Sequence, residues 1–138
     1  MGRLSEIMNR NLITVDKEAS LRQARRVLDQ HRMRHLLVTE AKRLVGIVTD
    51  RDLRTAATSS KSPLTTSERE EFMDALKVKE VMKRRLITAA PDTTVAEAAK
   101  AMVREKVGCL PVVNAGNVLV GIVTESDLLE VLVRGDRP

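Results

Sequence analysis

Apolar and polar residues follow the same order twice along this chain. In each copy, apolar positions at helical spacing are followed by two short, almost continuously apolar runs, and then by a second stretch with helical spacing. The first copy lies within residues 1–54 and the second within residues 78–138, with residues 55–77 between them. Short runs that are apolar throughout are typical of strands covered on both faces. The pattern therefore predicts an α/β fold built from two β-α-β-β-α units.

Capping residues mark the start of the first long helix in each copy. Ser20 with Gln23, and Thr94 with Glu97, have the spacing of a capping box, in which two side chains satisfy backbone N–H groups that the helix leaves unpaired. The apolar residues at helical spacing behind these caps are Leu21, Ala24, Val27 and Leu28 in the first copy and Val95, Ala98, Ala101 and Met102 in the second. The charged residues expected on the solvent face of the first helix are Arg22, Arg25, Arg26 and Asp29.

Shorter elements are expected around this helix. Those before it are a helical turn and an extended segment, at 4–8 and 12–15 in the first copy and at 78–82 and 86–89 in the second. Those after it are two strands separated by a turn, at 36–39 and 44–49 in the first copy and at 110–113 and 119–124 in the second. A final helix then begins at Asp50 or Glu125.

The segment between the copies begins with many Ser and Thr residues. Thr55–Thr66, which contains Pro63, is expected to be a mobile loop. The spacing of Ser67 and Glu70 predicts a capping box that opens a short helix ending near Leu76. We expect residues 55–77 to act as a linker, with a contact surface as the alternative.

The longest run that is identical in both copies is Leu-Val-Gly-Ile-Val-Thr, which starts at Leu44 and at Leu119. Two copies of one unit favour a closed pair with pseudo-twofold symmetry, because repeated units bury their apolar faces against each other. Such a pair has two equivalent clefts, an arrangement suited to binding a ligand twice. Gly46 and Gly121 within the run allow the close approach of a backbone or a ligand.

A Thr and an Asp close this run with the same spacing in both copies, as Thr49 with Asp52 and as Thr124 with Asp127. At a junction between a strand and a helix this spacing is itself a capping box. A short carboxylate at a helix N-terminus can also accept hydrogen bonds from two ribose hydroxyls, as an acidic residue does in dinucleotide sites. The residue types alone leave both interpretations open.

Composition narrows the class of protein. The chain has 138 residues, of which 43% are hydrophobic and 31% charged, as in a soluble globular protein. Its apolar runs are far shorter than the roughly 20 residues that cross a bilayer, and its N-terminus lacks an apolar signal segment. The single cysteine, Cys109, excludes an intramolecular disulfide. We therefore expect a cytoplasmic protein without membrane contact.

The net charge of +5 is unevenly distributed. Residues 1–54 hold 12 Lys and Arg against 7 Asp and Glu, whereas the rest of the chain is balanced. This excess would attract an anion such as a nucleotide phosphate or a nucleic acid, although a solvated helix face is the simpler explanation. Phe72 is the single aromatic residue, which disfavours modules that stack bases on aromatic side chains.

The combined motifs resemble the cystathionine β-synthase (CBS) domain, and the tandem copies resemble a Bateman module, a pair of such domains. The resemblance covers residues 4–54 and 78–133. The motifs that carry it are Glu-x-Met followed by Leu-Ile-Thr, the Ser/Thr-capped helix, His35-Leu36-Leu37-Val38 and Cys109-Leu110-Pro111-Val112, and Gly-Ile-Val-Thr-x-x-Asp in both copies. It implies a regulatory module that binds AMP, ADP or ATP, or a relative such as NAD or S-adenosylmethionine, and that has no catalytic residue, cofactor or metal.

The resemblance also implies which residues bind the ligand. The Asp of Thr-x-x-Asp would hold ribose hydroxyls, the Thr of the first extended segment would lie near ribose or phosphate, and backbone groups at the start of the next strand would read the adenine edge. The Ile of the repeated run would form an apolar wall. The residues implied are Thr14, Arg34, His35, Leu36, Ile47, Thr49, Arg51 and Asp52 in the first copy and Thr88, Gly108, Cys109, Leu110, Ile122, Thr124, Ser126 and Asp127 in the second.

In the family each cleft combines pieces of both copies, so that Thr14 would serve the site of Asp127, and Thr88 that of Asp52. The two sites are unequal, because Arg51 is matched by Ser126 in the second copy. We expect the site of Asp52 to bind the more highly charged nucleotide, since Arg51 can pair with phosphate.

The two copies also differ at other positions near the expected sites. Arg34 of the first copy is matched by Gly108 in the second, and the prolines frequent in the family are present in the second copy, while Lys17 and Leu37 replace them in the first. We expect these changes to alter the shape of the first pocket and to leave the fold intact.

We expect the module to act on a separate partner protein and to form a homodimer. The apolar residues suited to that contact are Leu128, Leu129, Val131 and Leu132, which could equally cover the core of their own copy. The alternatives are a nucleic-acid-binding protein that uses the basic first copy and an interaction scaffold with vestigial pockets. An enzyme is least favoured, because no pair of nucleophile and general base is visible. A zinc site at His31 and His35 is disfavoured, since His35 falls at a strand start, and Cys109 is expected to line a pocket or the core.

Overall fold

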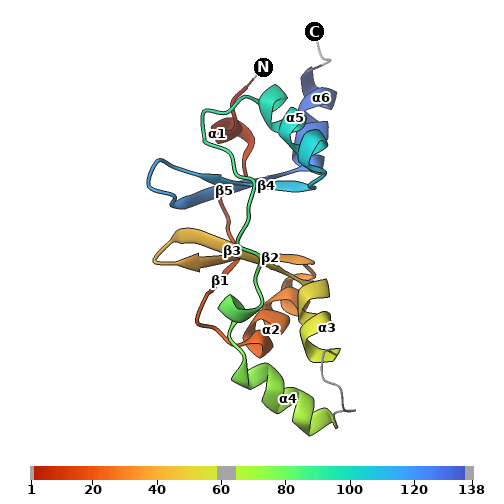
Figure 1. Ribbon diagram of the computed structural model, residues 1–138. Helices are drawn as coiled ribbons and strands as arrows, with labels where there is room; N and C mark the ends of the chain where they lie inside the picture. The colour runs from red at the N-terminus through yellow and green to blue at the C-terminus, as the bar shows by residue number, and fades with distance from the viewer. Residues whose placement is uncertain (1, 59–64, 136–138) are drawn as a thin grey trace. The chain divides into compact units, whose positions relative to one another are not determined.

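The computed structural model describes residues 2–58 and 65–135, which form two compact units. One unit consists of residues 13–86, and the other of residues 2–12 together with residues 87–135. We refer to them as the 13–86 unit and the 87–135 unit. Within each unit, helices pack against one face of a short sheet (Figure 1). This confirms the expected α/β fold with short sheets flanked by helices.

The sheet of the 13–86 unit has three strands. Their order is β1 (Thr14–Asp16), β2 (His35–Glu40) and β3 (Arg43–Thr49), with β1 parallel and β3 antiparallel to β2. The helical elements of this unit are α2 (Leu21–His31), α3 (Asp50–Thr58), α4 (Thr66–Ala75) and the 3-10 turn η1 (Val78–Glu80). The buried core residues are Val15, Leu21, Ala24, Leu28, Leu36, Val38, Val48, Leu53, Val78 and Met82.

The 87–135 unit contains a two-stranded antiparallel sheet of β4 (Cys109–Val113) and β5 (Leu119–Thr124). The first strand expected at 86–89 is corrected, because the segment does not form a strand: Ala89 makes a single parallel bridge to Val112, which corresponds by the repeat offset to the pairing of β1 with β2. Pro111 has no N–H with which to extend this pairing. The helices of this unit are α1 (Leu4–Ile7), α5 (Val95–Glu105) and α6 (Glu125–Gly135). The buried core residues are Leu4, Met8, Val95, Ala98, Met102, Leu110, Val112, Val123 and Leu128.

Both predicted capping boxes are formed. The Gln23 N–H donates to Ser20 Oγ over 3.1 Å, and the Ser20 N–H donates to Gln23 Oε1 over 2.8 Å. Thr94 and Glu97 make the same two bonds at the start of α5, both 3.1 Å long. The helices begin where the sequence places them because these side chains satisfy backbone donors that would otherwise lack partners.

Two expectations about the linking segment are corrected. The mobile loop was expected to begin at Thr55, but residues 55–58 belong to α3, because Leu53 and Ala56 pack in the core of the 13–86 unit and so extend the helix. Residues 59–64 lie outside the described residues. The capping box of α4 is formed by Thr65 and Glu68, with bonds of 3.1 and 3.2 Å, and not by Ser67 and Glu70. Both pairs have the required spacing, so the sequence pattern alone does not distinguish them.

The compact units and the sequence copies have different boundaries. Leu4 of α1 comes from the first copy but is buried in the core of the 87–135 unit, and its N–H donates to the carbonyl of Thr93 over 2.9 Å. Val78 of η1 comes from the second copy but is buried in the core of the 13–86 unit, and its N–H donates to the carbonyl of Ala19 over 2.8 Å. Each unit is therefore built from one copy and the leading segment of the other.

Candidate functional site

The expected ligand-binding residues are divided between the two units. The 13–86 unit contains Thr14, Arg34, His35, Leu36, Ile47, Thr49, Arg51 and Asp52, and the 87–135 unit contains Thr88, Gly108, Cys109, Leu110, Ile122, Thr124, Ser126 and Asp127. Within each unit, most of these residues lie where one strand begins, where the next strand ends and where the following helix starts, whereas Thr14, Ile47, Thr88 and Ile122 lie elsewhere.

The Thr-x-x-Asp motifs are capping boxes in both units. At the start of α3, the Thr49 N–H donates to Asp52 Oδ2 over 2.9 Å, and the Asp52 N–H donates to Thr49 Oγ1 over 3.0 Å. At the start of α6, the Thr124 N–H donates to Asp127 Oδ2 over 2.8 Å, and the Asp127 N–H donates to Thr124 Oγ1 over 3.3 Å. The capping interpretation is thus confirmed. A carboxylate has about four acceptor positions, so this role leaves each Asp able to accept further hydrogen bonds.

The sheet of the 13–86 unit separates candidate side chains from core side chains. Thr14 of β1, Leu37 of β2 and Ile47 of β3 are register partners and therefore share one face of the sheet. The neighbouring row of Val15 and Val38 belongs to the core under the helices. Thr14 and Ile47 thus lie on the sheet face opposite the helical core, and both are half-buried.

The strand starts contribute backbone more than side chains. Leu36 and Leu110 are fully buried, each within the helical core of its own unit, so their side chains are not on the opposite face of their own sheets. The carbonyl of Arg34 accepts from the Asp50 N–H over 2.9 Å, and the carbonyl of Gly108 accepts from the Glu125 N–H over 3.1 Å. These equivalent bonds hold the start of each strand against the start of the following helix.

Both glycines of the repeated run allow a close approach, as expected, and the group that approaches is a methionine. A Cβ atom at Gly46 would lie 2.5 Å from Met82 Sδ and 2.9 Å from the carbonyl oxygen of Lys83. A Cβ atom at Gly121 would lie 2.5 Å from Met8 Sδ. The Met of each sequence copy therefore packs on the Gly of the other, which explains why the two motifs recur together.

Lys83 is a candidate site residue that the sequence did not predict. Its Nζ lies 3.8 Å from Asp52 Oδ1, and both residues line a cavity of about 400 Å³ beside the first turns of α3. The other residues that line this cavity are Arg51, Thr55, Ala56, Glu80 and Val81. Lys83 directly follows the Met of its copy, and the matching residue of the first copy is Asn9. Aligning the copies shows this difference in charge, but only the fold places Lys83 beside Asp52.

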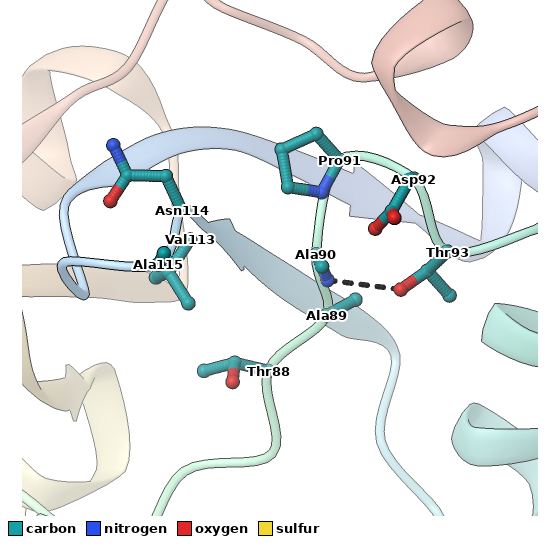
Figure 2. A pocket seen from close by; sticks show the side chains of 9 residues that line it. All are labelled: Thr88, Ala89, Ala90, Pro91, Asp92, Thr93, Val113, Asn114 and Ala115. Carbon is teal, nitrogen blue, oxygen red and sulfur yellow. Dashed lines mark hydrogen bonds between the residues drawn. The ribbon is translucent and has the colours of Figure 1, made fainter.

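A second cavity, of about 620 Å³, lies in the 87–135 unit (Figure 2). Of the expected ligand-binding residues, Thr88 lines it. The other lining residues are Ala89, Ala90, Pro91, Asp92, Thr93, Val113, Asn114 and Ala115. The Ala90 N–H donates to Thr93 Oγ1 over 3.0 Å, which orders the turn between Thr88 and α5.

The corresponding position of the 13–86 unit carries an ion pair. Lys17, which matches Pro91, pairs with Glu40, which matches Asn114. Charged side chains thus lie where the 87–135 unit has an open turn, in keeping with the expectation that the missing proline alters this part of the first copy.

The basic face of α2 is partly neutralised. Arg22 pairs with Asp74 of α4 at 2.9 Å, with Glu70 of the same helix 3.7 Å away. Arg25 is half-buried and bonds to Asp29 and Asp50, so the expectation that it points freely to solvent is corrected. These carboxylates hold the arginines and reduce the cationic surface that a nucleic acid would contact.

The histidines and the cysteine give no sign of metal or thiolate chemistry. His31 ends α2 and His35 begins β2, and within residues 2–58 and 65–135 there is no cluster of His, Cys, Asp and Glu side chains suited to a metal ion. Burial raises the pKa of the Cys109 thiol, which keeps it protonated. Across the same residues, no helix has the length and apolar character needed to cross a membrane.

Comparison with known proteins gives a consistent result. The sequence profile of the CBS domain matches residues 4–59 and 78–134. A CBS domain-containing protein of Dictyostelium discoideum is 36% identical over 132 residues, which span 95% of this chain and 91% of that protein. Inosine-5'-monophosphate dehydrogenase of Korarchaeum cryptofilum is 36% identical over 126 residues, which span 91% of this chain but 23% of that enzyme.

A solved structure extends the likeness to the fold. A CBS domain pair crystallised in complex with 5'-methylthioadenosine and S-adenosyl-L-methionine superposes with a TM-score of 0.73 at 27% sequence identity. The alignment covers 94% of this chain and 98% of that one.

Proposed function

The chain belongs to the CBS-domain family and carries two copies of the domain, and from this premise we propose that it is a regulatory module that binds an adenosine nucleotide. The observation that carries the proposal is the repeated helix start, where Asp52 and Asp127 are held by equivalent hydrogen bonds. A similar CBS domain pair binds two ligands that contain adenosine, which supports this ligand class. AMP, ADP and ATP are the first ligands to test, followed by NAD and S-adenosylmethionine.

Asp52 and Asp127 are proposed to accept hydrogen bonds from ribose hydroxyls. Each Asp uses one oxygen for the cap and retains acceptor capacity on the other. Thr14, Thr88, Ile47 and Ile122 are proposed to contact the nucleoside, with the strand-start residues reading the base through their backbone.

The module is proposed to act on another protein instead of catalysing a reaction. In the dehydrogenase from Korarchaeum cryptofilum, a stretch similar to this chain makes up about a quarter of an enzyme, which is consistent with a role alongside a catalytic domain. Ligand would regulate the partner by binding one conformation of the module more tightly than another. The pairing of Arg22 and Arg25 with carboxylates weakens the case for a nucleic acid as that partner.

A homodimer is proposed to form through α5 and α6. A largely apolar groove of about 290 Å³ runs between them, and Leu129 and Leu132 at its edge remain 60% and 58% exposed in the single chain. A second copy of the same face would bury these side chains, since a patch of this kind is unfavourable in water.

Thermal shift with a panel of AMP, ADP, ATP, NAD and S-adenosylmethionine tests the ligand proposal. A ligand that binds the folded state at a hundredfold excess over its Kd stabilises it by about 2.7 kcal/mol, which raises Tm by roughly 5–10 °C. We expect such a rise for the wild type and its loss in the Asp52→Asn/Asp127→Asn double variant, which lacks both negative charges.

The Asn variant is the matched control for capping. Asn keeps an oxygen that can accept the Thr49 or Thr124 N–H, so the protein without ligand should melt close to the wild type. An Asp52→Ala/Asp127→Ala variant removes cap bonds as well, at a cost of roughly 0.5–1 kcal/mol for each helix. If no member of the panel raises the Tm of the wild type, the nucleotide proposal is wrong.

A further inference from the structure

We infer that Lys83, together with Arg51, recognises nucleotide phosphates and makes the surface around Asp52 select ligands with more phosphate groups than the surface around Asp127 does. This inference rests on the proposed function, because it assigns a specificity to the same adenosine-nucleotide sites. The sequence indicates Arg51 alone for this role, and the structure adds Lys83 as a second cation from a different segment.

The position of Lys83 is fixed by its backbone. The Lys83 N–H donates to the carbonyl of Ile47 over 2.8 Å, and the Ile47 N–H donates to the carbonyl of Lys83 over 2.9 Å. The preceding Met82 packs directly on Gly46. These contacts attach the segment to β3 two residues before Thr49, so the side chain of Lys83 starts beside the N-terminus of α3.

The side chain of Lys83 is available to a ligand. It is 67% exposed, whereas the side chain of Asp52, 3.8 Å away, is 15% exposed and held by the cap. An exposed ion pair of this length adds little to stability, so the ammonium group can turn from Asp52 to a phosphate at small cost. A cavity of about 400 Å³ adjoins Lys83, Asp52 and Arg51, which gives a phosphate room to enter.

The 87–135 unit has the same backbone arrangement with different charges. The Asn9 N–H donates to the carbonyl of Ile122 over 2.9 Å, and the Ile122 N–H donates to the carbonyl of Asn9 over 3.0 Å. Met8 packs on Gly121. Asn9 therefore corresponds to Lys83, but its Oδ1 accepts from the N–H of Asn11 over 2.9 Å.

Ser126 stands where the other unit has Arg51, while the ribose-binding candidate is an Asp in both units. At these two matched positions, the surface around Asp52 carries positive charges and the surface around Asp127 carries neutral side chains. Because every added phosphate increases the negative charge of a nucleotide, this difference favours polyphosphates at Asp52. A Lys ammonium is a suitable point charge for phosphate, and an Arg can bind it through two N–H groups.

The chain supplies its own matched variants. In an Asp127→Asn background, which reports the Asp52 surface, Lys83→Asn and Arg51→Ser install the residues of the other unit. Isothermal titration at one ionic strength and without Mg²⁺ would measure Kd for adenosine, AMP and ATP. We expect Lys83→Asn to weaken ATP binding roughly three- to tenfold and AMP binding less, and to leave adenosine within about twofold, because adenosine has no phosphate.

The reciprocal experiment uses an Asp52→Asn background, in which Asn9→Lys with Ser126→Arg should strengthen ATP binding at the Asp127 surface relative to adenosine. If Lys83→Asn weakens adenosine, AMP and ATP equally, Lys83 acts through Asp52 or the fold, and the inference is overturned while nucleotide binding stands. If adenosine, AMP and ATP bind to neither background nor the wild type, the proposed function fails and this inference fails with it.

Discussion

At the scale of single residues, the fold depends on two glycines whose missing side chains are replaced by methionines from elsewhere in the chain. Met82 fills the space above Gly46, and Met8 fills the space above Gly121. The unbranched thioether of Met adapts to such narrow gaps. The two contacts differ in one respect, because Gly46 also lies against the backbone carbonyl of Lys83, whereas the nearest atoms to Gly121 all belong to the side chain of Met8.

Gly46→Ala is therefore expected to destabilise the protein more than Gly121→Ala. Overpacking of a core costs about 1–3 kcal/mol, and a side chain can move aside more easily than a hydrogen-bonded backbone. Chemical denaturation of both variants would measure the two losses. Adding Met8→Ala to Gly121→Ala should restore part of the lost stability, whereas adding Met82→Ala to Gly46→Ala should restore less. Equal losses of stability in the two Gly variants, with equal recovery, would contradict the packing argument.

At the scale of elements, an ionic cluster connects the turn after β1 with η1. Glu18 accepts hydrogen bonds from Lys79 at 3.0 Å and from Lys77 at 3.1 Å. The bond from Lys79, and after it the one from Lys77, lowers the pKa of the Glu18 carboxyl to about 2. Because this pKa lies below its ordinary value near 4.5, the folded state favours the ionised form of Glu18. The two ion pairs therefore help to hold the leading segment of the second copy on the 13–86 unit.

The contribution of Glu18 should depend on pH. A carboxyl whose pKa is lowered in the folded state stabilises that state above about pH 4.5 and loses this effect as the pH falls towards 2. At neutral pH and low salt, the wild type should therefore have a higher Tm than the Glu18→Gln variant. This difference in Tm should shrink between pH 4.5 and pH 2. Thermal melts of both proteins across this range measure it. A difference that stays constant with pH would show that the charge is not responsible, and added salt should reduce it because the groups are exposed.

At the scale of the whole molecule, the two sequence copies exchange their leading segments. The core of the 87–135 unit includes Leu4 and Met8 of the first copy, and the core of the 13–86 unit includes Val78 and Met82 of the second. Loss of one such side chain to Ala costs roughly 2–5 kcal/mol in other cores, against a total stability of about 5–15 kcal/mol. Neither copy alone contains all of the apolar residues that its unit buries.

The proposed homodimer can be tested on the exposed face of α6. Sedimentation of the wild type should give a dimer, and Leu129→Glu with Leu132→Glu should give a monomer, because charged side chains cannot be buried there without partners. Both leucines are more than half exposed in the single chain, so circular dichroism should be unchanged. Lys42→Glu, an exposed change in the turn between β2 and β3, serves as the control and should remain dimeric. A monomeric wild type at high concentration would contradict the proposal.

Most of the helices and strands could be predicted from the sequence. The capped helices after Ser20 and Thr94, the paired strands around the turns, and the helix starts at Asp50 and Glu125 are all confirmed. These features depend on side chains close to one another in the chain, whose spacing can be read directly. The same local reasoning predicted the cap of the Thr-x-x-Asp motif, which contributes Thr49, Asp52, Thr124 and Asp127 to the candidate site.

The tertiary structure alone decided which distant segments meet. Three such contacts join residues that are 25 or more positions apart in the sequence. They are the pairing of Arg25 with Asp50, the burial of Leu4 with the second copy and the position of Lys83 beside Asp52. Periodicity reports which face of an element is apolar, but it carries no information on which other element covers that face. For this reason the charge difference between Lys83 and Asn9 became visible once each leading segment was seen packed on the glycine of the other copy.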